Sequence, residues 1–190
     1  MKTTNVLYLL IGFFALTACV SCKDDGETTT PNDSNSGTTL PDLVVDLTAT
    51  ENGAIIEKIQ FTNPKQTSTT ASGNGSYNAS VDLFSLNVLG QIGSAGPSFG
   101  FTGATGGVKK GIYDVAMDNR VCTYATSTPE VFLNGSGTVE ITEATLYANA
   151  GIGLKEHFCD FNVDVVLQST DKSRSIQVKG TIKGVNIKEN

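Results

Sequence analysis

The feature that most constrains the fold is a strict alternation of apolar and polar residues in short segments. Residues 159–167 are the clearest case: Cys159, Phe161, Val163, Val165 and Leu167 alternate with Asp160, Asn162 and Asp164. Successive side chains of a β-strand point to opposite faces, so this segment predicts a strand with one buried and one wet face. Residues 43–49 and 137–142 alternate in the same way. No segment shows a convincing helical period, and the chain is therefore predicted to be all-β.

Glycine-rich turns separate the remaining short segments, which favours many strands in one domain. We expect further strands at 55–61, 79–91, 98–102, 111–117, 120–125, 130–133 and 176–187, and a long loop at 62–78. Eight to ten short strands predict an antiparallel β-sandwich. The alternative is a partly closed, calycin-like barrel, which could hold an apolar cavity.

The first two strands predict their own register. Both carry apolar residues at odd positions, so both should bury the odd face. A two-residue turn at Asn52-Gly53 would pair odd with even positions. A three-residue loop of residues 51–53 pairs Val45 with Ile59, Leu43 with Phe61 and Asp46 with Lys58, and this is the register we expect.

Two other strands change face along their length. In residues 79–91, Val81 and Leu83 lie on one parity while Phe84, Leu86 and Val88 lie on the other. This pattern indicates either two covered faces or a bulge near Leu83. In the last strand the apolar face switches after Ile182, and Gly184 is the expected position of a bulge.

Charge excludes one class of partner. The chain has 13 basic and 19 acidic residues among 190, a net charge of −6. Nucleic-acid binding needs a concentrated basic surface, so nucleic acid is not an expected partner.

The N-terminus indicates export and lipid attachment. Lys2 precedes an apolar run at residues 6–15 that is shorter than the roughly 20 residues of a membrane-spanning helix. Leu16-Thr17-Ala18-Cys19 then resembles the lipobox of bacterial lipoproteins, in which a signal peptidase cleaves before a cysteine that receives lipid. The resemblance implies acylation, palmitate included, at Cys19; Cys22, which precedes Lys23-Asp24-Asp25, is the alternative.

This resemblance also divides the chain. Residues 1–21 are expected to be the lipoprotein signal segment, 22–41 a flexible polar tether, and 42–190 the β-domain. The tether prediction follows from residues 24–39, which contain no aliphatic or aromatic side chain and cannot bury anything. The acidic run after Cys22 resembles a surface-export signal. The expected location is the cell envelope, as an outer-membrane lipoprotein exposed at the cell surface and attached to the membrane through its N-terminal lipid.

A second resemblance concerns the β-domain. Gly111-Ile112-Tyr113, the strand at 137–142 and the glycine-bearing strand at 180–185 are similar to strands of small, uncharacterised β-rich envelope lipoproteins of bacteria. This likeness implies an extracytoplasmic β-domain and transfers no active-site residue.

Residues that could carry chemistry are few. His157 is the only histidine, and we interpret it as a hydrogen-bonded residue at a strand edge. Asp160, Asn162 and Asp164 share one face of a strand, but their spacing of about 6.6 Å cannot supply the oxygen shell of calcium. Residues 103–107 with Lys109 and Lys110 lack the spacing of a phosphate loop and predict a hairpin tip. We therefore expect no catalytic residue, no metal site and no cofactor.

Two cysteines lie beyond the signal and tether. Export would place Cys122 and Cys159 in an oxidising compartment, where paired thiols persist, so we predict a disulfide between them. Two separately buried thiols are the alternative.

The expected function is that of a non-catalytic binding or interaction module with an unknown protein or glycan partner. A carrier of a small apolar ligand in a barrel cavity is the second hypothesis, and a hydrolase is the third. The absence of Trp weakens a sugar-stacking surface, although Tyr77, Tyr113, Tyr124 and Tyr147 leave one open.

Overall fold

The computed structural model describes residues 40–91, 96–117, 119–150 and 154–190. Within these ranges it contains ten strands and a short 3-10 turn, η1 (Pro64–Gln66). The strands are β1 (Leu43–Glu51), β2 (Ala54–Asn63), β3 (Ser72–Asn78), β4 (Leu83–Leu89), β5 (Ser98–Gly103), β6 (Gly111–Asp114), β7 (Arg120–Ala125), β8 (Val131–Ala150), β9 (Leu154–Ser169) and β10 (Ser175–Glu189). Among the described residues, no helix has the length and apolar character needed to cross a membrane.

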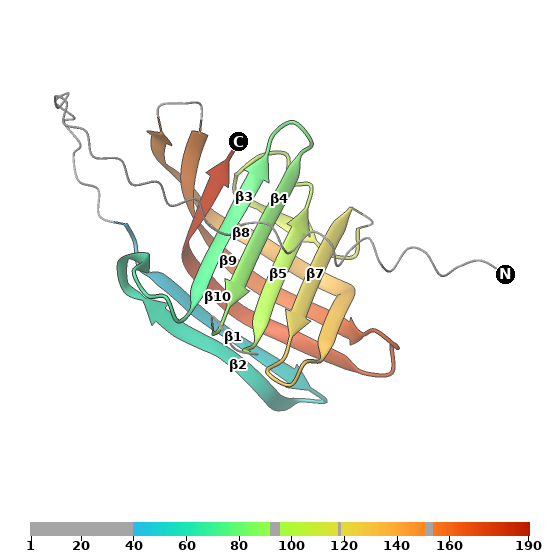
Figure 1. Ribbon diagram of the computed structural model, residues 1–190. Coiled ribbons are helices and arrows are strands. Elements are labelled where there is room, and N and C mark those ends of the chain that lie inside the picture. Colours follow the sequence, from blue (N-terminus) through green and yellow to red (C-terminus); the bar gives the residue numbers. More distant parts are fainter. Residues whose placement is uncertain (1–39, 92–95, 118, 151–153) are drawn as a thin grey trace, which may run out of the picture. The chain divides into compact units, whose positions relative to one another are not determined.

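Seven strands close into a barrel in the order β3-β4-β5-β7-β8-β9-β10, and β10 returns to pair with β3. Figure 1 shows β3, β4, β5 and β7 side by side on one wall, with β8, β9 and β10 behind them. Strands β1, β2 and β6 lie outside this ring. The β1–β2 hairpin extends the sheet from the first half of β10, and β6 pairs with β8.

The closed barrel corrects the predicted sandwich. The all-β class is confirmed, and the architecture is the barrel that the sequence left as the alternative. A sandwich needs two sheets, whereas here β8, β9 and β10 are long strands that bend at register shifts and carry one sheet round to its own edge. Every pairing is antiparallel except β10 with β3, which is parallel.

Apolar side chains fill the barrel interior. Phe84, Phe99, Phe101, Phe132, Phe161 and Tyr124 are fully buried there. The Phe84 ring lies 6.3 Å from Phe101 and 6.1 Å from Phe161, between centroids, and each pair is tilted. Tilted rings at these separations are a favourable aromatic geometry. Small barrels of this strand number are filled by their own side chains, and this one follows the rule.

The predicted register of the first hairpin is wrong by two residues. Val45 pairs with Phe61 and Leu47 with Ile59, and the turn is the two-residue Asn52-Gly53 after all. Both turn residues have positive φ, at 51° and 80°, as this turn requires. A bulge between Ala49 and Thr50 restores odd-with-odd pairing. The predicted burial of the odd face holds along β1, where the odd residues from Leu43 to Ala49 are buried.

Burial along β2 follows the prediction only in part. Ile59 is buried and Phe61 half-buried, whereas Ile55 lies beyond the bulge and is exposed.

The face switch in the last strand is confirmed. The register of β10 against β9 shifts between Ile182 and Val185, and Gly184 lies at the shift with φ +73°. Ile182 and Val185 are both buried, so the bulge keeps the apolar side chains inward before and after it.

Two other expectations near β3 and β4 are corrected. Residues 72–78, predicted as loop, form β3, whose glycine, serine and asparagine residues conceal the alternation. Val81 lies before β4, and it is exposed together with Leu83, so β4 has one buried face made by Phe84, Leu86 and Val88.

Polar clamps hold loops at two places on the barrel. Asp82 accepts hydrogen bonds from the backbone N–H of Gly106 (2.7 Å) and Thr105 (3.3 Å) and from the Tyr77 hydroxyl (3.2 Å). These bonds, that of Gly106 foremost, hold the pKa of Asp82 below its usual value.

The second clamp is formed by Arg174, which donates to both carboxylate oxygens of Glu51 at 2.7 and 2.6 Å and contacts Glu130. The second clamp joins the β1–β2, β7–β8 and β9–β10 connections.

Candidate binding surface

The outer faces of β3, β4, β5 and β7 form one wall that carries no charged side chain, and all of these positions are among the described residues. We call this wall the uncharged face. Its outward-facing residues are Ser72, Asn74, Ser76, Asn78, Leu83, Ser85, Asn87, Leu89, Ser98, Gly100, Thr102, Val121, Thr123 and Ala125. A protein surface typically has about 25–35 % charged residues, so about four would be expected here. The absence of all four sets this wall apart.

The opposite wall carries the charges. The outward positions of β8, β9 and β10 include Glu140, Asp160, Asp164, Lys179 and Lys183. A groove of about 360 Å³ lies there, and its polar groups bond to one another. Lys179 Nζ is 2.8 Å from Asp164, and Asn162 Nδ2 donates to Glu140 at 2.8 Å. The hydrogen bonds from Lys179 and then Gln177 lower the pKa of Asp164. These pairs join β8, β9 and β10 across the groove.

A single row of residues crosses the uncharged face at right angles to its strands and continues onto β8 and β9. Strand pairing brings each member beside the next, and we call the set the Asn87 row: Asn74, Asn87, Gly100, Thr123, Leu133 and Gln168. Amide side chains in the row can both donate and accept, as can the Thr123 hydroxyl. Leu133 supplies an apolar contact. The row therefore offers uncharged hydrogen-bonding groups in a fixed order.

Gly100 lies between Asn87 and Thr123 in the row. A Cβ at this position would lie 2.7 Å from Thr123 Oγ1 and 3.3 Å from Asn87 Oδ1. Glycine is thus the residue that lets its two neighbours lie close on either side. The polar ends of the Asn87 and Thr123 side chains therefore meet over Gly100.

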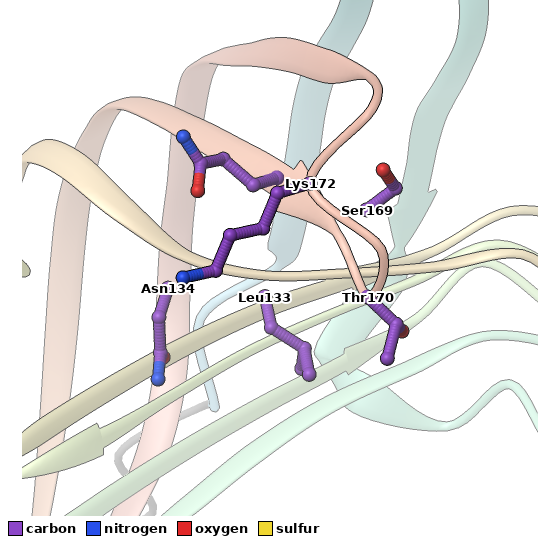
Figure 2. A pocket seen from close by; sticks show the side chains of 6 residues that line it. Leu133, Asn134, Ser169, Thr170 and Lys172 are labelled. Carbon is purple, nitrogen blue, oxygen red and sulfur yellow. The ribbon is translucent and has the colours of Figure 1, made fainter.

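A small hollow of about 200 Å³ lies at the Leu133 end of the row. Figure 2 shows the side chains that line it, with Lys172 extending beside Asn134. The lining residues are Leu133, Asn134, Gln168, Ser169, Thr170 and Lys172. Asn134 (φ 27°) and Lys172 (φ 60°) both have left-handed backbones, and β8 shifts register between Leu133 and Ser136. The strand irregularity therefore creates the hollow, which is smaller than the roughly 300–1,000 Å³ of a complete small-molecule site.

The oxygen cluster considered from sequence does not converge. Asp160 accepts from the backbone N–H of Gly184 at 2.8 Å, while Asn162 and Asp164 bond to neighbouring strands. In the part of the chain that the structure describes, no three potential metal ligands come together. Each of the three side chains instead joins strands on the charged wall.

His157 pairs with a carboxylate. Its Nε2 lies 2.8 Å from Glu189, which Lys155 also contacts at 3.2 Å. Burial alone would raise the pKa of Glu189, but the bonds from His157 and Lys155 outweigh it and the pKa is lowered. His157 is buried, as its parity in β9 predicts. This arrangement ties β9 to the end of β10.

The amides of the 103–107 loop already hold an anion from the chain itself. Thr105 and Gly106 donate to Asp82, so the positions that a phosphate would need are taken by a carboxylate. The predicted hairpin tip is in fact the β5–β6 connection.

Of the four tyrosines considered for sugar stacking, three lie in the interior: Tyr77, Tyr113 and Tyr124. Tyr147 packs edge-on against Phe158 at 4.8 Å between centroids.

Cys122 and Cys159 are both buried, and both are free thiols in the structure. Burial raises the pKa of each to about 12. Their disulfide stays a prediction that thiol counting tests. Cys19 and Cys22 lie outside the described residues, as do the signal segment and nearly all of the tether.

No family of known proteins, curated protein or solved structure matches this chain.

Proposed function

We propose that this chain is a non-catalytic binding module of the cell envelope, held to the membrane by lipid on Cys19, or alternatively on Cys22. The uncharged face is its contact surface. The location rests on the lipobox resemblance and the binding role on the structure, so each part is tested separately.

One observation carries the binding role: charge is absent from the outward positions of four adjacent strands and concentrated on the opposite wall. Burying a charged side chain against a partner is unfavourable unless it finds a counter-charge. The cores of protein contact surfaces are accordingly depleted in charged residues. A wall that meets only water has no such restriction.

The carrier hypothesis has less support. A carrier needs an internal apolar cavity, whereas the inward positions of this barrel are occupied by packed phenylalanine rings.

Chemical labelling tests the contact surface without knowledge of the partner. Asn87→Cys places a thiol on the uncharged face, and Gln60→Cys places a matched thiol on the exposed side of β2. Whichever of Cys19 and Cys22 is not acylated is replaced by serine. Cys122 and Cys159 are buried and react slowly.

We expect the uncharged face to be protected from maleimide when the protein is in the cell envelope. Reaction of Asn87→Cys with a maleimide should be at least about tenfold slower in isolated envelopes than in the purified full chain. Gln60→Cys should react equally in both. Equal rates for Asn87→Cys in the two settings would refute the proposed contact surface.

A further inference from the structure

We infer that the uncharged face binds a neutral, hydroxyl-rich polymer, a polysaccharide chain laid along the Asn87 row with one unit in the Leu133 hollow. This inference rests on the proposed function and names the chemistry of its ligand.

The length of the row favours a polymer. Its six members lie on six adjacent strands, four of them in the uncharged face, and strands are about 4.8 Å apart, so the row is about 24 Å long along the curved surface of the barrel. The hollow beside Leu133 has room for part of a ligand only. A compact molecule needs a concave site, whereas an extended chain of repeated units can bind by several contacts along an open sheet face.

The bonding groups favour hydroxyls. Asn74, Asn87 and Gln168 each carry an amide that donates and accepts, and Thr123 carries a hydroxyl that does the same. Sugar hydroxyls are likewise donors and acceptors, so each meets a partner whichever way it is turned. A polyanion would find no cation along the uncharged face itself. Lys172, in the hollow, can donate to a neutral oxygen as well.

Area argues against a second copy of this chain as the occupant. Four strands about 4.8 Å apart and about seven residues long outline a face of roughly 450 Å². A stable protein pair buries about 800 Å² on each partner. The uncharged face is about half that size.

The test is affinity electrophoresis of the full chain in a detergent that contains no sugar. The gels contain cellulose derivatives, xylan, mannan or dextran as neutral polymers, and polygalacturonate as the charged one. Repeated contacts along a polymer make weak single contacts measurable. Asn87→Lys and Thr123→Lys introduce one charge into the row, and Gln60→Lys introduces the same charge on β2 as the matched control.

We expect at least one neutral polymer to retard the wild-type chain and polygalacturonate not to. Asn87→Lys and Thr123→Lys should each weaken the retardation at least tenfold, and Gln60→Lys should leave it unchanged.

Three results would overturn the inference: no retardation by any neutral polymer, equal effects of Asn87→Lys and Gln60→Lys, or self-association in sedimentation that Asn87→Lys abolishes. If maleimide protection of Asn87→Cys in envelopes persists without polymer binding, the contact surface stands and only the ligand class is wrong. If Asn87→Cys is not protected in envelopes and no neutral polymer retards the chain, both proposals are refuted.

Discussion

Replacing Gly180 by alanine should be among the most damaging small changes to this barrel. Gly180 pairs with Leu47 across β10 and β1, and its φ is +150°. A Cβ there would lie 1.9 Å from the carbonyl oxygen of Asp46 and 3.0 Å from the Cα of Leu47. Both are backbone atoms, so relief requires β1 to move away from β10. Strained backbone costs about 1–3 kcal/mol, and overpacking about another 1–3 kcal/mol, which predicts a loss of about 2–6 kcal/mol in unfolding free energy.

Gly53→Ala is the matched control. Gly53 also has positive φ, at +80°, but nothing lies within 4 Å of its added Cβ. Only the conformational cost remains, about 1–2 kcal/mol. Urea unfolding of both full-length variants, followed by circular dichroism, measures the difference. If the two variants lose the same free energy within about 0.5 kcal/mol, the close approach of β1 and β10 does not restrict this position.

Four further expectations follow from the sequence and structure. Tyr124→Phe should leave stability unchanged or raise it by about 1 kcal/mol, because its buried hydroxyl has no hydrogen-bond partner; a loss above about 1 kcal/mol in urea unfolding would show that the hydroxyl is bonded. Thiol titration of denatured protein from an oxidising compartment should find Cys122 and Cys159 joined, and two titratable thiols there would refute the disulfide. In reduced protein each thiol has a folded pKa of about 12 against an ordinary value of 9.0, so its stabilising contribution is complete below about pH 9 and is lost as pH rises toward 12. Unfolding free energy should then fall by about 1.4 kcal/mol per thiol by pH 10, and Cys122→Ala should reduce the fall by that amount. Replacing both Cys19 and Cys22 by serine should release the protein from the membrane fraction, and continued partition into detergent would refute the lipid anchor.

The parts of the fold that were predictable are those encoded by local alternation. The strand at 159–167 and the switch at Gly184 follow from side-chain period and from the backbone freedom of glycine, both of which are local properties. β3 was missed because Gly73 and Gly75 take inward positions where an apolar residue would reveal the period. Closure was not predictable, since it depends on the pairing of β3 with β10, far apart in sequence.

The uncharged face could not be predicted from the sequence for a related reason. The reactive groups that stand out in the sequence, such as His157 and Asp160, form hydrogen bonds within the protein: His157 with Glu189 at the end of β10, and Asp160 with the backbone of Gly184 on the charged wall. The uncharged face has no reactive group, and its signal is an absence spread over four strands. Reading the outward positions of Ser85, Asn87, Gly100 and Thr102 together would have exposed it, but only once their strands were known to be neighbours.

The division of β10 between two partners has a consequence for how the chain folds. Its residues 177–183 pair with β1, and residues 186–189 pair with β3, so the tenth strand joins the first hairpin to the barrel and also seals the ring. Strands β3 to β9 can assemble by successive neighbouring contacts, but the ring stays open until residues 186–189 reach β3. Contacts between such distant segments are slow to form. We expect closure by β10 to limit the folding rate, and the unpaired edge of β3 to be the place where unfinished chains associate.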